Sequence, residues 1–87
     1  MIKVLELIDS GFVGGGQTHI LSICKNLNKE LFYPVVSAYP FGDFKKMIVD
    51  VNIKFCDIVI RKIYRKKYLD NLEKIVEKER IDIIHAE

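Results

Sequence analysis

The chain lacks tryptophan and holds few cysteines, prolines and glycines: two, two and five among its 87 residues. Cys24 and Cys56 lie far apart and match neither a CxxC pair nor a metal-ligand spacing. We therefore interpret both as small buried hydrophobic residues in a reducing compartment, which excludes a disulfide framework. The shortage of proline and glycine, together with an apolar fraction of 49%, excludes a disordered or collagen-like chain.

The sequence also lacks a long hydrophobic run and a large excess of either charge. The apolar segment Ile2–Ile8 is too short to be a signal peptide or to span a membrane, and Lys3 and Glu6 interrupt it. Fourteen Lys and Arg against twelve Asp and Glu give a net charge of +2, which does not demand a polyanionic partner such as nucleic acid. We expect one small cytoplasmic domain.

Aliphatic stretches alternate with amphipathic stretches along the whole chain. The aliphatic stretches predict four buried strands, at Ile2–Ile8, Pro34–Tyr39, Ile53–Cys56 (extending toward Ile60) and Ile81–Ala86. Apolar residues at helical spacing predict three helices, at Gln17 to about Asn28, Phe44 to about Val51 (with Asp43 as N-cap) and Tyr68 to about Arg80. This alternation predicts an α/β fold, a Rossmann-like doubly wound parallel sheet with strand order 3-2-1-4.

Four of the five glycines lie between the first predicted strand and the first predicted helix. Gly14, Gly15 and Gly16 match neither a GxGxxG fingerprint, because no glycine stands three residues beyond Gly16, nor a Walker A loop, because no Gly-Lys-Ser/Thr follows. Such a loop still lets backbone N–H groups approach a phosphate at the edge of the sheet where ligands bind. A merely structural turn fits the same residues equally well.

Two stretches resemble the retaining glycosyltransferases of family 4. The strand Ile2–Ile8, followed by Asp9-Ser10 and then by Gly14-Gly15-Gly16-Gln17, is similar to their start, where a Gly-Gly-x-Glu type loop follows the first strand. The segment Asp82-Ile83-Ile84-His85-Ala86-Glu87 is similar to their Asp-Ile-Val-His-x-His strand ending. Gln17 departs from an acid that is common in the family, and Glu87 departs from the second histidine. The resemblance spans the whole chain.

The resemblance implies the GT-B fold, in which two Rossmann-like domains face each other across a cleft. Residues 1–87 would then be a truncated N-terminal, acceptor-side domain, and the C-terminal donor-binding domain would be absent. The parent enzyme would transfer a sugar from a nucleotide sugar to a saccharide or lipid-linked acceptor, as in cell-envelope polysaccharide biosynthesis. The fragment alone would be inactive, with no catalytic residue, no metal and no cofactor besides the nucleotide sugar as co-substrate.

The same resemblance assigns roles to individual residues. The three glycines would face the donor phosphates, while Asp9, Gln17 and His85 would contact the acceptor or shape the cleft. The residues themselves leave other roles open. Asp9 could cap the loop, His85 could hydrogen-bond a neighbouring loop, and His19 could either donate to a phosphate or stay solvated.

One cluster of charge stands out in the sequence. It consists of cationic residues interleaved with tyrosines, namely Arg61, Lys62, Tyr64, Arg65, Lys66, Lys67 and Tyr68. Enzymes of the resembled family often act on lipid-linked acceptors, and a basic, aromatic patch suits an anionic inner membrane surface, at about 1 kcal/mol per cation. Cations at the beginning of a helix oppose its dipole, so helix stability does not explain the cluster. A solvated surface run is the alternative interpretation.

The last predicted strand has no following helix to cover it. Either the sequence is a piece of a longer protein, or the open edge pairs with a second copy and forms a homodimer. Two further functions remain as alternatives to the enzyme. A receiver-like signalling module would use Asp9 and Asp57, but it has no use for a triple glycine. A non-catalytic binding module of the same fold is the other.

Overall fold

The computed structural model describes residues 1–9 and 14–87. The middle of the predicted glycine loop, residues 10–13, lies outside the described residues. Strands and helices alternate in the order β1 (Ile2–Leu7), α1 (Gly15–Asn26), β2 (Phe32–Ala38), α2 (Phe44–Asp50), β3 (Lys54–Asp57), α3 (Arg65–Glu79) and β4 (Ile83–Ala86). The four strands form one sheet in the order β3-β2-β1-β4, and every pair is parallel. The predicted α/β fold and its strand order are confirmed.

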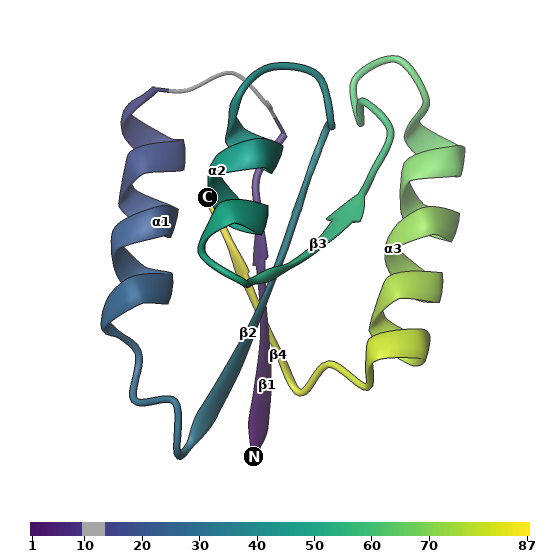
Figure 1. The fold of residues 1–87 in the computed structure, drawn as a ribbon. Helices are drawn as coiled ribbons and strands as arrows, with labels where there is room; N and C mark the ends of the chain where they lie inside the picture. The colour runs from purple at the N-terminus through teal and green to yellow at the C-terminus, as the bar shows by residue number, and fades with distance from the viewer. Residues whose placement is uncertain (10–13) are drawn as a thin grey trace.

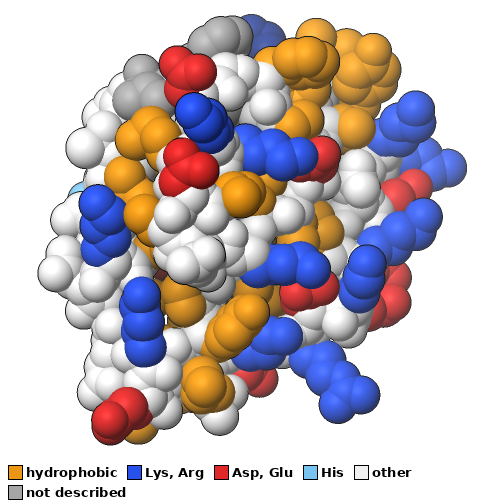
Figure 2. Space-filling view, viewed as in Figure 1, with side chains coloured by type: hydrophobic (Ala, Val, Ile, Leu, Met, Phe, Trp, Pro, Cys, Tyr) orange, Lys and Arg blue, Asp and Glu red, His pale blue; other side chains and the backbone are white. Residues whose placement is uncertain are grey.

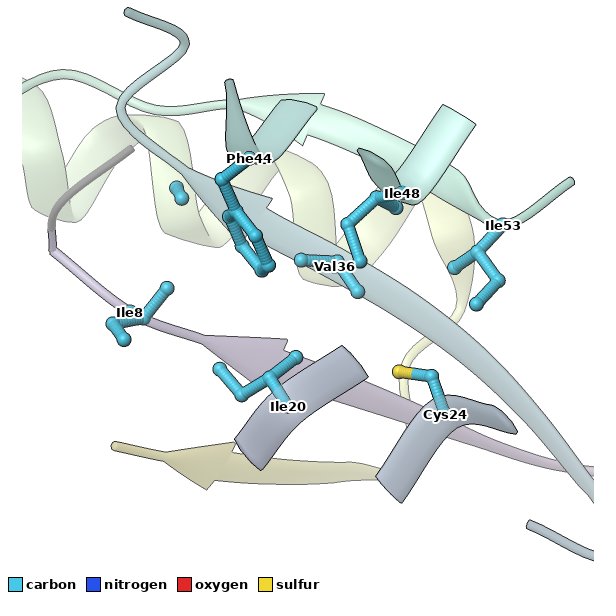
Figure 3. Packing of buried hydrophobic residues seen from close by; sticks show 8 residues of the cluster. Ile8, Ile20, Cys24, Val36, Phe44, Ile48 and Ile53 are labelled. Atoms are coloured by element: carbon cyan, nitrogen blue, oxygen red, sulfur yellow. The ribbon is translucent and has the colours of Figure 1, made fainter. Parts of the chain in front are cut away.

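Helices cover both faces of the sheet (Figure 1). On one face, α1 and α2 pack through a buried cluster that includes Ile20, Phe44 and Ile48, which Figure 3 shows converging over β1 and β2. On the other face, α3 packs Tyr68 and Ile75 against the sheet. The central strands β1 and β2 are therefore buried on both sides, which explains their nearly continuous aliphatic sequences.

Two local expectations need correction. The helix α3 begins at Arg65 rather than Tyr68, because periodicity marks only a buried face and the polar first turn gives no such signal. Leu69 belongs by its spacing to the apolar stripe of this helix, yet it is 55% exposed. The prediction of Asp43 as the N-cap residue of α2 is confirmed, although its side chain makes no cap hydrogen bond.

The strands β1 and β4 are joined by residues from opposite ends of the chain. The Lys3 N–H donates to Asp82 Oδ2 at 2.9 Å, and the Asp82 N–H donates to the Lys3 carbonyl oxygen at 2.8 Å. These bonds help to set the register in which Glu6 is opposite His85 and Leu7 is opposite Ala86. The register therefore brings the end of β4 to the end of β1, next to the glycine loop.

Candidate functional site

The carboxyl ends of β1 and β4 meet the first turn of α1 at one edge of the sheet. Asp9 follows β1, Gly14 is the N-cap residue of α1, and His85 lies within β4. In parallel α/β sheets this is the edge where ligands bind. Most of the residues that the sequence singles out are therefore gathered in one region of the molecule.

The three glycines differ in their surroundings. A Cβ atom on Gly16 would stand 2.8 Å from Ile8 Cδ1 and 3.6 Å from Glu87 Cγ, whereas a Cβ atom on Gly15 would meet no atom within 4 Å. The first turn of α1 thus packs directly on the end of β1, and a side chain at position 16 would have to displace the end of the Ile8 side chain. Gly15 instead borders open space, where its backbone remains accessible to a ligand.

This contact gives a prediction about stability. We expect Gly16→Ala to have a free energy of unfolding about 1 kcal/mol lower than Gly15→Ala, because both gain the helix propensity of alanine but only the methyl group at position 16 meets the buried Ile8 side chain. Ile8→Val removes the clashing Cδ1 atom, so the same Gly16→Ala change should cost less in that background. Urea unfolding of the two single variants and the double variant measures this coupling.

Gly15→Ala is the matched control for this cycle, because its methyl group enters open space and should change stability by at most about 0.5 kcal/mol. Strictly additive effects of Ile8→Val and Gly16→Ala would show that the 2.8 Å approach does not constrain the loop.

Gln17 is buried at the beginning of α1. The residue is only 6% exposed, and its Oε1 atom stands 3.3 Å from the position of a Cβ atom on Gly14. The next residue stabilises the first turn, since Thr18 Oγ1 donates to the Gly14 carbonyl oxygen at 2.9 Å. The Gln17 side chain therefore lies against the N-cap residue of α1.

His85 pairs with a carboxylate from the neighbouring strand. Its Nδ1 atom lies 2.6 Å from Glu6 Oε2, and the Glu6 side chain is 3% exposed while that of His85 is 45% exposed. The hydrogen bond and the negative charge of Glu6 raise the pKa of His85 above its ordinary value. The partner of His85 is thus a buried strand residue, and not the loop that one interpretation of the sequence suggested.

Sequence reasoning missed Glu6 as part of this site. A signal was present, because Glu6 is the one acidic residue within an otherwise aliphatic and basic strand, and a buried carboxylate requires a partner.

The negative charge of Glu6 also affects Cys24, a buried residue of α1. Burial, followed by the charge of Glu6, raises the pKa of the Cys24 thiol to about 12. Cys24 is therefore an unreactive buried thiol, as its sequence surroundings predict.

Glu87 lies close to the first turn of α1. Its N–H donates to the Leu7 carbonyl oxygen at 2.9 Å, and its Oε1 atom is 3.8 Å from His19 Nε2. An anion bound at the glycines would therefore meet a carboxylate as well as the N–H groups and His19. Glu87 therefore lies against Gly16 and near His19, the residues on either side of Gln17 and Thr18 in the chain.

A groove of about 410 Å³ opens beside this region, between the ends of β1 and β4 and the beginning of α3. Its polar groups come from Asp9, Arg61, Arg65, Tyr68 and Glu87, and Arg61 Nη2 lies 3.8 Å from Asp9 Oδ2. Burial, and then the charge of Asp9, raise the pKa of the Tyr68 phenol, which is a hydrogen-bond donor at neutral pH. The groove combines two carboxylates, guanidinium groups and a phenol, which suits a ligand rich in hydroxyl groups.

The predicted basic cluster is divided by this geometry. Arg61 and Arg65 line the groove, whereas Lys62, Lys66 and Lys67 are exposed to solvent and do not. His85 and the three glycines lie outside the lining of the groove, whereas Glu87 lines it and also approaches Gly16, so the edge has two adjoining parts.

The described part of the chain contains no group of three or more His, Cys, Asp or Glu side chains arranged to hold a metal ion. Across residues 1–9 and 14–87, no helix has the length and apolar character needed to cross a membrane. Comparisons with known proteins give no match, whether with family models, curated proteins or solved structures.

Proposed function

We propose that this chain is the acceptor-side part of a glycosyltransferase of the GT-B type, which transfers a sugar from a nucleotide sugar to a saccharide or lipid-linked acceptor. The observation that supports the proposal best is the contrast between Gly15 and Gly16. Close packing at Gly16 holds the beginning of α1 at the ligand-binding edge, and the open space at Gly15 leaves room for a diphosphate. The resemblance of the loop and of the β4 segment to family 4 points to the same chemistry.

In this proposal the two parts of the edge have different ligands. The donor phosphates approach Gly14, Gly15 and Gly16, and the acceptor occupies the groove that Asp9 and Arg61 border. His85, held by Glu6 on β4, lies outside the lining of the groove, and in this proposal it helps to shape the wider cleft. A second domain supplies most of the nucleotide contacts, so the chain alone has no transferase activity.

We expect this chain to bind nucleotide sugars weakly, because Glu87 places a carboxylate beside Gly16. Titration of the ¹⁵N-labelled chain with UDP-glucose and with GDP-mannose, followed by NMR, should shift the amides at the beginning of α1, with dissociation constants near the millimolar range. Glu87→Gln should tighten binding a few-fold, because it removes the opposing charge. Gly15→Ala should weaken binding while the rest of the spectrum stays unchanged.

Two outcomes would contradict this assignment. Tight binding of a nucleotide sugar by the chain alone would show that no second domain is needed to hold the nucleotide. Amide shifts that are unaffected by both Gly15→Ala and Glu87→Gln would mean that the glycines form only a structural turn.

The receiver-like alternative is not favoured by the strand order. Asp57 ends β3 at the edge of the sheet, and β2 separates it from β1 and Asp9. In receiver-type sheets the order is 2-1-3-4-5, which puts the first and third strands side by side. Asp57 is also paired with Lys45 Nζ at 2.8 Å. A non-catalytic binding module of the same fold remains the second candidate.

A homodimer through β4 stays a prediction. All four residues of β4 are exposed, and Ile83 and Ile84 remain 48% and 46% exposed. Pairing of two β4 edges would cover these side chains. Size-exclusion chromatography with light scattering should therefore give a dimer that Ile84→Lys converts to monomer. A monomer at all concentrations would favour coverage of β4 by further chain instead.

Two other expectations from the sequence also stay predictions. They are a location in the cytoplasm at the inner membrane surface and membrane contact through Arg61, Lys62, Arg65, Lys66 and Lys67.

A further inference from the structure

The opposite edge of the sheet carries a separate surface that the proposed function does not use. There β3 pairs with β2 on one side only. The Ile58 N–H donates to the Ala38 carbonyl oxygen at 3.2 Å, and backbone groups alternate in direction along a strand. Phe55 and Asp57 therefore direct their N–H and C=O groups outward, and no strand among the described residues pairs with them.

A groove of about 380 Å³ runs along this edge, between α2 and α3. Its floor includes Phe55 and Cys56, and its sides carry four lysines, Lys45, Lys54, Lys74 and Lys78. In Figure 2, Lys and Arg side chains gather over the side of the molecule that carries α3. The unpaired backbone of β3 is therefore bordered by positive charge.

Most of this charge is not neutralised within the chain. Asp57 and Glu79 are the two acids of the groove, and Asp57 is paired with Lys45. Among the described residues, Lys54, Lys74 and Lys78 form no ion pair. Burial and then the charge of Glu79 raise the pKa of the Cys56 thiol, while the charges of Lys54 and Lys78 oppose this shift. The charges of these two lysines therefore act on the floor of the groove.

The groove lysines come from three elements, and two of them follow one another along α3. Lys74 and Lys78 are four residues apart on α3, a spacing of about 6 Å along the helix axis. Side chains on one face of an extended strand repeat at about 6.6–6.8 Å. A single small anion would meet one or two of these lysines, whereas carboxylates at alternate positions of a strand would meet them in succession.

We propose that the outer edge of β3 binds an acidic peptide in extended conformation, which adds a strand to the sheet and places its carboxylates among Lys54, Lys74 and Lys78. Backbone hydrogen bonds to Phe55 and Asp57 supply the pairing, and the lysines supply the selectivity. Lysines on an edge strand discourage pairing with an apolar strand, and they favour an acidic one. A nucleic acid could use the charges and accept from the outward N–H groups, but it has no peptide backbone with which to form a strand ladder.

Fluorescence anisotropy with a labelled eight-residue peptide that alternates glutamate with valine or threonine tests this proposal. We expect saturable binding that weakens about tenfold in Lys74→Glu/Lys78→Glu, because two attractions become repulsions. The control variant, Lys66→Glu/Lys67→Glu, makes the same change of net charge on the same helix outside the groove. It should change the dissociation constant by less than about twofold.

A proline peptide, amide hydrogen exchange and two other anions separate strand addition from general electrostatic attraction. A peptide that differs only by a proline at its centre should bind at least about tenfold more weakly, because it cannot complete the hydrogen-bond ladder with β3. Amide hydrogen exchange at Phe55 and Asp57 should slow on binding. Equal binding of the proline peptide, an equal loss in both lysine variants, or tighter binding of oligothymidylate or inorganic phosphate would each overturn the proposal.

Discussion

An alanine in place of Phe44 is expected to lower the free energy of unfolding by about 3–5 kcal/mol. Phe44 is the first residue of α2, is fully buried, and lies in the cluster that joins α1, α2 and the sheet (Figure 3). A chain of this length has a free energy of unfolding of about 4–13 kcal/mol. The substitution would therefore remove a large part of the total stability, and urea unfolding followed by circular dichroism measures the loss.

Phe41 provides the matched control, three residues away along the chain. Its side chain is 62% exposed and touches Tyr39, with ring centroids 5.0 Å apart. Phe41→Ala should lower the free energy of unfolding by no more than about 1 kcal/mol, mainly through loss of the ring pair. Similar losses for the two variants would contradict the packing of α2 described above.

Removal of His85 is expected to have the second largest effect. His85→Ala leaves the Glu6 carboxylate, which is 3% exposed, without its imidazole partner. An unsatisfied buried polar group costs about 1–3 kcal/mol, and we expect the lower half of this range because water can enter where the half-exposed imidazole stood. Urea unfolding of His85→Ala at pH 6, beside the parent chain, measures the cost.

The same pair predicts a pH dependence. Glu6 raises the pKa of His85 in the folded state, so the stabilisation is present in full below the unfolded pKa of about 6.5 and is lost as the pH rises through the higher folded value. The stability of the parent chain should therefore fall as the pH rises above about 6.5. Glu6→Gln should flatten this dependence, whereas Glu87→Gln should change it less, because Glu87 is the smaller cause. An unchanged profile in Glu6→Gln would contradict the assignment.

The sequence predicts the order of the strands well because that order depends on rules that act over the whole chain. Alternation of strands and helices demands parallel pairing, and right-handed crossovers leave few arrangements. The buried faces of helices are less certain. In α3, Tyr68 and Ile75 are two turns apart and both buried, whereas Leu69, one position from Tyr68, is exposed. One residue corresponds to about 100° of rotation, so a broad apolar stripe does not specify its own centre.

The candidate site was predictable in location but not in its contacts. Asp9 and the glycines lie between the first predicted strand and the first predicted helix, and His85 lies near the end of the fourth predicted strand, which places them at one edge. The pairing of Glu6 with His85 depends on a register between segments 79 residues apart, and no local pattern encodes that register. The close approach of Gly16 to Ile8 likewise depends on the angle at which α1 meets the sheet.

The pairing of β1 with β4 also has a consequence for the order of folding. The ribosome adds about 5–20 residues per second, so β1 leaves it roughly 4–16 s before β4 is complete. During that interval β2 can pair with one edge of β1, while the other edge has no partner. Contacts between such distant segments also slow folding itself. Nascent-chain chaperones would therefore meet β1, one of the two central strands, while one of its edges is still unpaired.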